Sequence, residues 1–303
     1  MDRAGNNARW RGACRLCGEG QVTPRYRLSA LSVVDCHGCG AVFTTVVPDR
    51  AALEAMYAEG YFRERHTYYF ENAQIRSDVE PDENTRAFGE FLDRLEARRG
   101  QGHLLDVGCW MGIFLSLARA RRWQVRGVEL SAFASEDARR RFALPVVTGT
   151  LRDAAFPEAS FDVVTLLDVF EHLPDPRAEL AELFRVLRPG GTLLLDTPNA
   201  DALLRRLADR MYRWTRGALA YPVRKLYHEF HLFYYSEQIL RRLLGEAGFL
   251  VEAVEGRAIP LPKARGTAVE KWIVKGLSLM ERRLNGSFEL VVIARRPTAA
   301  ERT

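Results

Sequence analysis

Residues 104–112 read LLDVGCWMG, an apolar run that enters a glycine turn. Gly112 opens the apolar segment IFLSLARAR at 113–121, which has helical spacing. A strand, a glycine turn and a helix in this order are typical of the first unit of a nucleotide-binding α/β sheet. Trp110 stands where a third glycine is expected, so the stretch raises the question of which ligand it would hold.

Further apolar runs alternate with helical patterns from residue 103 onward. The expected strands are HLLDVG at 103–108, QVRGVEL at 124–130, LPVVTG at 144–149, FDVVTLLDV at 161–169, GTLLLDTP at 191–198, FLVEAVEG at 249–256 and SFELVVIARRP at 287–297. This alternation predicts the α/β class, with a doubly wound, mostly parallel seven-stranded sheet that helices cover on both faces. Ligands of such sheets bind beyond the carboxyl ends of the strands.

An acidic residue accompanies the glycine turn. Glu129 ends the second strand 23 residues after Asp106, and a carboxylate there can accept both hydrogens of a ribose diol. A dinucleotide site needs GxGxxG, so that a pyrophosphate can lie on the helix N-terminus. The turn here is DxGxxxG with Trp110 inside it, which favours a smaller nucleoside that has no diphosphate.

The overall composition is that of a globular protein. The chain has 303 residues, 47% of them hydrophobic and 27% charged, without an apolar run of about 18 residues. The first residues lack the apolar core of a secretory signal, which predicts a cytoplasmic protein with reduced thiols. A net charge of +5 favours acidic partners such as nucleotides, phosphates, RNA or anionic lipid head groups.

Four of the five cysteines form two matched pairs, CRLC with Cys14 and Cys17 and CHGC with Cys36 and Cys39. A glycine follows each pair, and two such turns supply a closed tetrahedral set for Zn²⁺. Four thiolates leave no open coordination position, so the expected zinc is structural. His37 is interpreted as a surface residue of this zinc-binding module, which spans residues 1–48.

Two stretches with helical apolar spacing follow the cysteines. They are PDRAALEAMYAEGYFRERHTYYF at 48–70 and ENTRAFGEFLDRLEARRG at 83–100. We interpret residues 49–100 as connecting helices that pack on the main domain, residues 101–303.

Four segments of the main domain carry a more specific pattern. They are LLDVGCWMGIFL at 104–115, GVELS at 127–131, GTLRDAAFPEASFDVVTLLDVFEHLPDP at 149–176 and RVLRPGGTLLLDTPN at 185–199. In order and spacing they resemble the motifs of class I S-adenosylmethionine-dependent methyltransferases of the ubiquinone type, over roughly residues 100–255. The resemblance implies a methyltransferase with the Rossmann-like fold and S-adenosyl-L-methionine as its cofactor. In that family the turn usually reads DxGxGxG, from which Trp110 departs.

The resemblance implies a cofactor-binding role for each matching position. The methionine end of the cofactor would be lined by Asp106, Gly108, Cys109 and Gly112. Glu129, with the adjoining Leu130, would hold the ribose, and Thr150 and Leu151 would lie at the adenine. Asp168 would face the amino acid portion. Two alternatives stay open. Asp168 can instead cap a strand end, and Cys109 is interpreted as a packed turn residue rather than a nucleophile.

Two histidines are candidates for a catalytic base, which an acceptor that carries a proton requires. His172 follows the fourth strand, and His231 precedes a helix that begins near Ser236. Together with the cysteine module, the segment YHEFH is distantly similar to bacterial sugar C-methyltransferases, in which a tyrosine, a glutamate and a histidine of a YHEH-like segment serve the acceptor. The similarity implies Tyr227, Glu229 and His231 as catalytic residues, with His228 as the alternative histidine.

An insertion at 202–227 has a strongly two-sided helical pattern. Leu204, Leu207, Met211 and Trp214 share one face, and five arginines share the other. This arginine face suits a diphosphate or an anionic membrane surface, or else the helix is a solvated lid with its apolar stripe in the core. TAVEKWIVKGLSLMERRL at 267–284 shows a similar stripe.

The first hypothesis is an enzyme that methylates oxygen or carbon of a small polar acceptor that carries phosphate, such as a nucleotide-linked sugar or glycan precursor. One alternative is an RNA methyltransferase, although nucleic acid is disfavoured because the cysteine turns contain few basic residues. Others are a membrane-peripheral methyltransferase of a lipid-linked substrate and a non-catalytic binding module on this fold. No motif encodes the acceptor or the oligomeric state.

Overall fold

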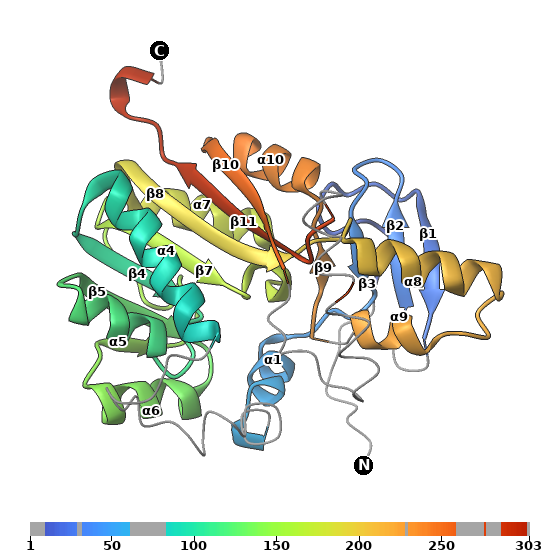
Figure 1. The fold of residues 1–303 in the computed structure, drawn as a ribbon, viewed down its shortest axis with the longest axis horizontal. Helices are drawn as coiled ribbons and strands as arrows, with labels where there is room; N and C mark the ends of the chain where they lie inside the picture. Colours follow the sequence, from blue (N-terminus) through green and yellow to red (C-terminus); the bar gives the residue numbers. More distant parts are fainter. Residues whose placement is uncertain are drawn as a thin grey trace.

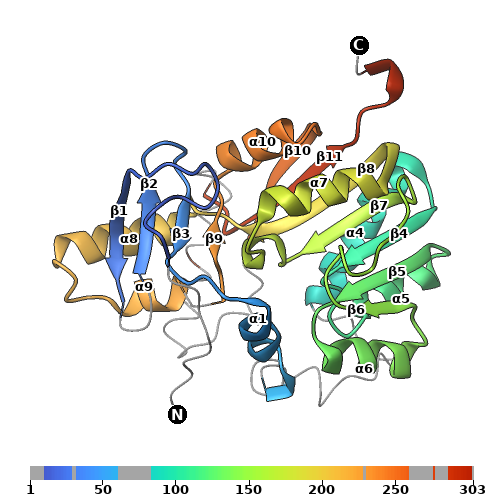
Figure 2. The same cartoon turned by 180° about the vertical axis from the view of Figure 1, so that it is seen from behind.

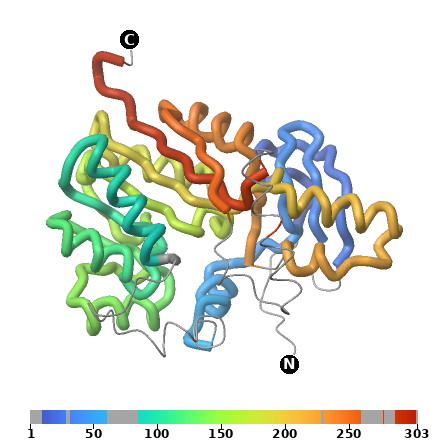
Figure 3. The backbone as a smooth tube through the Cα atoms, viewed as in Figure 1, coloured from blue at the N-terminus to red at the C-terminus, as the bar shows by residue number. Residues whose placement is uncertain are grey.

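The structure is a computed structural model and describes residues 10–28, 32–60, 83–227, 230–258, 276 and 286–301. In this part of the chain the strands form two sheets that lie next to each other (Figure 1). The larger sheet occupies one end of the molecule, and the N-terminal strands occupy the other, as the tube in Figure 3 also shows.

The larger sheet has seven strands in the order β10-β11-β8-β7-β4-β5-β6. Their bounds are β4 His103–Val107, β5 Gln124–Glu129, β6 Val146–Thr148, β7 Phe161–Leu167, β8 Leu187–Pro198, β10 Leu250–Arg257 and β11 Glu289–Arg295. The five strands from β8 to β6 are parallel, whereas β11 pairs antiparallel with β8 and β10. The predicted seven-stranded, mostly parallel sheet is therefore confirmed.

Helices cover both faces of this sheet. On one face lie α4 Glu83–Arg99, α5 Ile113–Ala120 and α6 Ala132–Phe142, and on the other lie α7 Pro176–Val186 and α10 Glu237–Glu246 (Figures 1 and 2). Neighbouring strand residues supply the two cores, because side chains alternate along a strand. Leu104 packs in a cluster with Phe91 of α4, and Leu105 packs in another with Leu183 of α7. Both leucines are fully buried.

Three helices begin at a side chain that caps them. The hydroxyls of Ser131 and Ser236 and the carboxylate of Asp175 each accept a hydrogen bond from a backbone N–H three residues later. Such caps satisfy amide groups that a helix cannot satisfy itself, so they fix where α6, α10 and α7 start. The starts of α6 and α7 come after β5 and β7 of the larger sheet, whereas α10 starts after β9 (Phe233–Tyr234) of the smaller sheet.

The smaller sheet is antiparallel, with the order β1-β2-β3-β9. Its strands are β1 Val22–Arg27, β2 Ser32–Cys36, β3 Val42–Thr44 and β9 Phe233–Tyr234. The last strand comes from a segment nearly two hundred residues downstream, so residues 1–48 do not complete the sheet alone. Phe43 and Phe233 are paired across it, and both belong to the same buried cluster as Leu105. The cysteine region and the larger sheet thus share one core.

Helix α1 Arg50–Met56 follows the cysteine region, and Asp49 caps it by accepting a hydrogen bond from the N–H of Ala52 at 2.8 Å. Together with α4, it lies within the stretch 49–100 that the sequence predicts as connecting helices. A short η1 turn, Phe170–His172, follows β7, and η3 Ala299–Glu301 follows β11.

The insertion between β8 and β9 forms α8 Leu203–Trp214 and α9 Tyr221–Leu226. Its orientation departs in part from one sequence-based alternative, the apolar stripe in the core, because Leu204 and Leu207 are half-buried but the end of the stripe is exposed. Arg205 and Ala208 are the buried residues of α8, with 2% exposure each, whereas Met211 is 42% and Trp214 is 87% exposed. The guanidinium of Arg205 lies over the rings of Tyr227 and Tyr234, which explains how a cation can be turned inward. Apart from position 276, the helix predicted at 267–284 lies outside the described residues.

None of the helices in the described ranges combines the length and the apolarity that crossing a bilayer requires.

Candidate cofactor and acceptor site

The turn after β4 has three residues at positive φ, namely Gly108 at 73°, Trp110 at 51° and Gly112 at 78°. The N–H of Gly108 donates to the carbonyl of Val128 at 2.8 Å, which ties the turn to β5. A Cβ atom on Gly108 would lie 2.4 Å from Cγ2 of Val169, so no side chain fits there. The flanking glycines are therefore required, while the turn accommodates a left-handed tryptophan between them.

The side chain of Trp110 has a defined environment. With Tyr57 and Phe133, it packs against a small buried cluster of Met111 and Ala134. Its backbone N–H donates to Oε2 of Glu129 at 2.9 Å. The residue that departs from the usual glycine therefore connects the turn to α6 and to the end of α1.

Two buried acids, Asp106 and Glu129, lie at the carboxyl ends of β4 and β5. Burial raises the pKa of Asp106 to about 7, although Thr165 donates a hydrogen bond to its Oδ1 at 2.6 Å. Burial likewise raises the pKa of Glu129. The N–H groups of Trp110 and Ser131 each donate to one oxygen of Glu129, and a carboxylate has further lone pairs for other donors. The pair is suited to a ligand that brings hydroxyl donors and positive charge.

The other predicted cofactor positions lie along the same edge of the sheet. Leu130 follows β5, Thr150 and Leu151 follow β6, and Asp168 follows β7 at a φ of 55°. Because these strands are parallel, their carboxyl ends point the same way. Leu151 is buried, Leu130 and Asp168 are half-buried, and Thr150 is exposed. Burial raises the pKa of the Cys109 thiol well above its usual value, so it remains protonated and packed, unlike a nucleophile.

A second group of side chains, Glu171, His172 and His231, lies beside this edge. Glu171 and His172 belong to η1, and His231 precedes β9. Oε1 of Glu171 lies 3.8 Å from Nε2 of each histidine, and the two imidazole rings are edge to face at 4.7 Å. Their ligand atoms all lie within 4.8 Å, an arrangement that suits a shared proton or a cation.

Hydrogen bonds set the protonation of this trio. Nδ1 of His172 lies 2.6 Å from the carbonyl of Phe230, which can only accept, so Nδ1 carries the proton and Nε2 presents its lone pair toward Glu171. Burial lowers the pKa of His172 and raises that of Glu171, to which the charge of Asp168 adds. Thr197 donates to Oε2 of Glu171 at 2.9 Å, which holds the carboxyl in place. His172 is therefore neutral near pH 7.

Tyr57, at the end of α1, connects the two groups. Its ring lies edge-on to His172 at 6.0 Å and tilted to Phe230 at 6.4 Å. Its carbonyl accepts a hydrogen bond from the Ser131 hydroxyl at 2.7 Å, next to Glu129. The tyrosine thus spans from the cofactor strand β5 to the histidine pair.

The other residues predicted to be catalytic, Tyr227 and Glu229, do not belong to this trio. Tyr227 is buried, and its ring lies 4.6 Å from that of Tyr234, which lies 5.6 Å from the ring of His231. Tyr234 thus contacts both Tyr227 and His231. Glu229 and the alternative histidine His228 lie outside the described residues.

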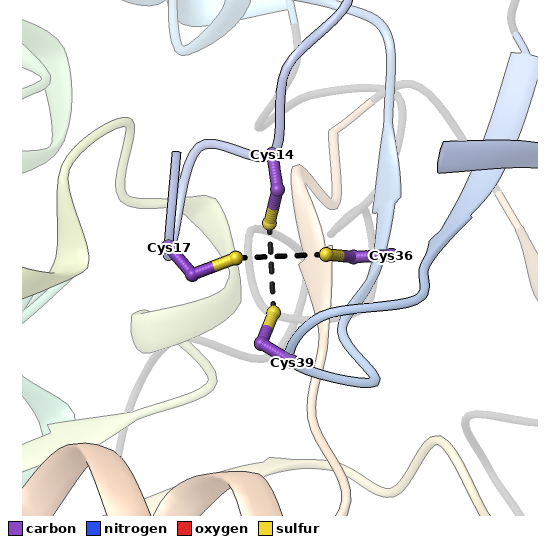
Figure 4. Close-up of side chains that lie close together, drawn as sticks. All are labelled: Cys14, Cys17, Cys36 and Cys39. Atoms are coloured by element: carbon purple, nitrogen blue, oxygen red, sulfur yellow. Dashed lines mark hydrogen bonds between the residues drawn. The ribbon is translucent and has the colours of Figure 1, made fainter. Parts of the chain in front are cut away.

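The four predicted zinc ligands converge on one point (Figure 4). Sγ of Cys14 lies 3.6 Å from Sγ of Cys39, and the Cys17 and Cys36 sulfurs are also 3.6 Å apart. A tetrahedral zinc with bonds of about 2.3 Å requires sulfurs about 3.8 Å apart, whereas a disulfide requires about 2.05 Å. The donor set and spacing therefore fit Zn²⁺ with all four positions occupied by thiolates.

A separate cavity of about 500 Å³ lies between the second cysteine turn and α10. Gly38, Gly40, Gln238 and Arg242 contribute to its wall. It contains no residue of the cofactor edge or the histidine pair.

Comparison with known proteins identifies the family of this chain. A family model described as a methyltransferase domain matches residues 75–254, more than half of the 303 residues. The chain belongs to this methyltransferase family. The matched range contains the glycine turn, Glu129 and His172, so the predicted methyltransferase family is confirmed.

The relatives of this methyltransferase have varied functions. A probable S-adenosylmethionine-dependent methyltransferase of Mycolicibacterium smegmatis is 36% identical over 107 residues, which is 35% of this chain and 42% of that protein. The O-methyltransferase resE of Aspergillus sclerotiorum is 31% identical over 157 residues, or 46% of this chain and 58% of that protein. The matches span 34 to 58% of the length of the curated relatives.

Among solved structures, the cyclase SpnF superimposes with a TM-score of 0.56 at 19% identity and covers 83% of this chain and 97% of SpnF. Together with the methyltransferase-domain match, this likeness confirms the predicted Rossmann-like fold. Since that protein is a cyclase, the fold alone does not assign a reaction, and the site must do so.

Sequence patterns assign neither Glu171 nor Tyr57 to the site of this methyltransferase. Glu171 directly precedes His172 in FEHLPDP, and that adjacency is the one signal that could have identified it. Tyr57 lies far from the sheet motifs in the chain and reaches the site only through tertiary packing. The arrangement as a whole can hold a cationic nucleoside beside a neutral imidazole base.

Proposed function

We propose that this methyltransferase transfers the methyl group of S-adenosylmethionine to an oxygen or carbon of a small polar acceptor, such as a nucleotide-linked sugar or a glycan precursor. The observation that carries the proposal is the trio of buried Glu171 and half-buried His172 and His231 beside the carboxyl edge of the sheet. Hydroxyl and activated carbon acceptors carry a proton, which a base must take during methyl transfer. Relatives named as O-methyltransferases support an oxygen acceptor.

The cofactor-binding positions support this proposal. When bound, S-adenosylmethionine would supply a sulfonium methyl group that an acceptor atom can attack, with S-adenosylhomocysteine as the leaving group. Asp106 would face the ammonium group of its methionine end, since a nearby cation lowers the pKa that burial has raised to about 7. Glu129 would accept the ribose hydroxyls, and the backbone at Thr150 and Leu151 would lie against the adenine.

His172 is the proposed base. Its Nδ1–H is held by the Phe230 carbonyl, so Nε2 can take a proton from the acceptor. Glu171, whose Oε1 is 3.8 Å from both imidazoles and whose pKa burial raises, would share the proton that His172 takes. His231 would orient the acceptor or share that proton, and Tyr57 would close the site from the side of α1.

Zinc at the four cysteines would be structural. Arg15, between Cys14 and Cys17, donates to the carbonyls of Thr44 and Leu232 at 3.1 Å each. Leu232 directly follows His231, so a metal that fixes the cysteine turn also fixes the approach of this histidine.

Titration with cofactor tests the first half of this proposal. We expect the wild type to bind S-adenosylmethionine and Glu129→Gln to bind it roughly 10 to 150 times more weakly, because a hydrogen bond to a charged group is worth about 1.5–3 kcal/mol. Glu90→Gln, on the exposed face of α4, is the matched control and should bind like the wild type. If the wild type, loaded with zinc, shows no binding by calorimetry, the chain is a binding module rather than an enzyme.

A labelled-cofactor screen tests the second half. The protein is incubated with methyl-labelled S-adenosylmethionine and fractions of a cell extract, and label should enter a small polar fraction. Label that enters RNA or the lipid fraction instead would contradict the proposed acceptor class while leaving methyl transfer intact.

The pH dependence should follow from the neutral state of His172. Burial lowers its pKa below the ordinary value, and the Phe230 carbonyl and the Asp168 charge oppose this only in part. Glu171, His231 and Tyr57 face the same ring. We therefore expect kcat/KM to be constant from about pH 7 upward and to fall about tenfold per pH unit once the pH drops below the lowered pKa. A profile that still rises above pH 8 would contradict this base.

A further inference from the structure

The insertion between β8 and β9 has an unusual charge. Residues 203–226 contain seven arginines and lysines but only one acidic residue, Asp209. The whole chain has 44 basic and 39 acidic residues, so the remainder holds 37 basic and 38 acidic ones. The net positive charge of the protein therefore belongs entirely to this α8–α9 hairpin.

Six of the seven cations are exposed. They are Arg206, Arg210, Arg213, Arg216, Arg224 and Lys225. Large apolar side chains accompany them. The exposed fractions are 42% for Met211, 87% for Trp214, 47% for Leu219 and 56% for Tyr221. In the part of the chain that the structure describes, Leu250 is the one other large hydrophobic residue that is exposed in this way. Exposed apolar groups of this size mark interaction sites when they gather in one place.

The hairpin is well anchored, so this exposure is a feature of its folded state. Arg205 donates to the carbonyl of Leu226 at 2.6 Å, and the Tyr26 hydroxyl donates to Asp209 at 2.9 Å. In the connecting loop, the N–H of Gly217 donates to the carbonyl of Tyr212 at 2.8 Å. In Figure 1 this loop forms the end of the molecule farthest from β5 and β6.

We propose that the α8–α9 hairpin binds the surface of an anionic lipid bilayer. Tryptophan and tyrosine favour the level of the lipid head groups, and an amphipathic helix with arginines beside its apolar residues lies in that interface. Each cation near an anionic surface adds to the attraction. Nucleic acid would attract the same cations, but Met211 and Leu219 gain nothing from it, whereas acyl chains accept both. The inference does not depend on methyl transfer or on the acceptor.

Vesicle co-sedimentation tests this surface. The full chain is mixed with vesicles of phosphatidylcholine that contain about 30 mol% phosphatidylglycerol, or with phosphatidylcholine alone. We expect binding to the anionic vesicles, weaker binding at high salt, and little binding to the neutral ones. Arg210→Ser/Arg216→Ser should weaken binding roughly thirty-fold, and Trp214→Ser/Leu219→Ser should weaken it at least about tenfold.

Matched controls keep the test specific. Arg119→Ser/Arg126→Ser removes two exposed arginines at the other end of the molecule, and Leu250→Ser removes the remaining exposed apolar group. Both should bind vesicles like the wild type, and all variants should retain their circular dichroism and cofactor titration. Equal sedimentation with neutral and anionic vesicles, or undiminished binding by both hairpin variants, would overturn the proposal. Binding of labelled single-stranded RNA without vesicle binding would overturn it in favour of a nucleic acid surface.

Discussion

We expect His172→Asn to lower kcat for methyl transfer by about 10² to 10⁴, the usual contribution of a general base. The asparagine amide can still donate to the Phe230 carbonyl, which Nδ1 approaches at 2.6 Å, so the substitution removes chiefly the Nε2 atom near Glu171. The affinity for S-adenosylmethionine should stay within about twofold, because His172 lies beside the cofactor edge rather than within it. Label transfer to the acceptor fraction, at saturating cofactor, measures the change.

His103→Asn is the matched control for this variant. His103 begins β4, at the opposite end of the strand from the glycine turn, and should tolerate the change with full activity. A His172→Asn enzyme whose kcat falls less than about tenfold would show that the proton leaves by another route. A loss that appears only in KM would instead assign His172 to acceptor binding.

The larger sheet could be predicted because its signal is local. The central strands carry apolar residues on both faces, as Leu104 and Leu105 do, and such continuous runs between helical patterns are typical of a parallel sheet with two covered faces. Parallel strands also bring their carboxyl ends together, so Asp106, Glu129 and Asp168 could be assigned to one edge before their contacts were known.

The completion of the smaller sheet and of the site could not be predicted in the same way. β9 has only two residues, Phe233 and Tyr234, too few to show a strand period, and it pairs with β3 across a long stretch of chain. Tyr57 likewise meets His172 through the packing of α1 on the sheet edge. Such contacts depend on tertiary structure, which a single sequence does not encode in a short motif.

For the α8–α9 hairpin, the sequence predicts the two faces of a helix but not which of them is buried. Helical spacing correctly grouped Leu207, Met211 and Trp214 on one face of α8, but periodicity cannot tell which face the protein buries. The guanidinium of Arg205 lies over the rings of Tyr227 and Tyr234, so the face of α8 that contains Arg205 is turned toward the protein. Met211 and Trp214 of the stripe are then exposed, while Leu204 and Leu207 are half-buried, contrary to the usual assignment of such a stripe to the core.

Replacing Cys36 by serine should have the largest effect on stability. Structural zinc contributes an apparent 10 to 16 kcal/mol in small zinc domains, and a missing thiolate forfeits much of it. We expect the variant to lose its zinc, to melt at least about 5 °C lower, and to lose at least about 90% of its methyl transfer. Metal analysis, calorimetry and label transfer measure the three effects. Cys109→Ser, a buried thiol outside the cluster, should keep one zinc per chain.

Activity should fall along with stability because the cysteine turn supports the histidine pair. The carbonyl of Leu232, next to His231, accepts hydrogen bonds from Arg15 at 3.1 Å and from the N–H of Thr44 at 3.0 Å. Arg15→Gln should therefore retain zinc yet lower kcat several-fold, since it weakens the support without removing a metal ligand. If Arg15→Gln and Cys36→Ser both transfer methyl groups at the wild-type rate below their melting temperatures, the metal module stabilises the fold without positioning His231.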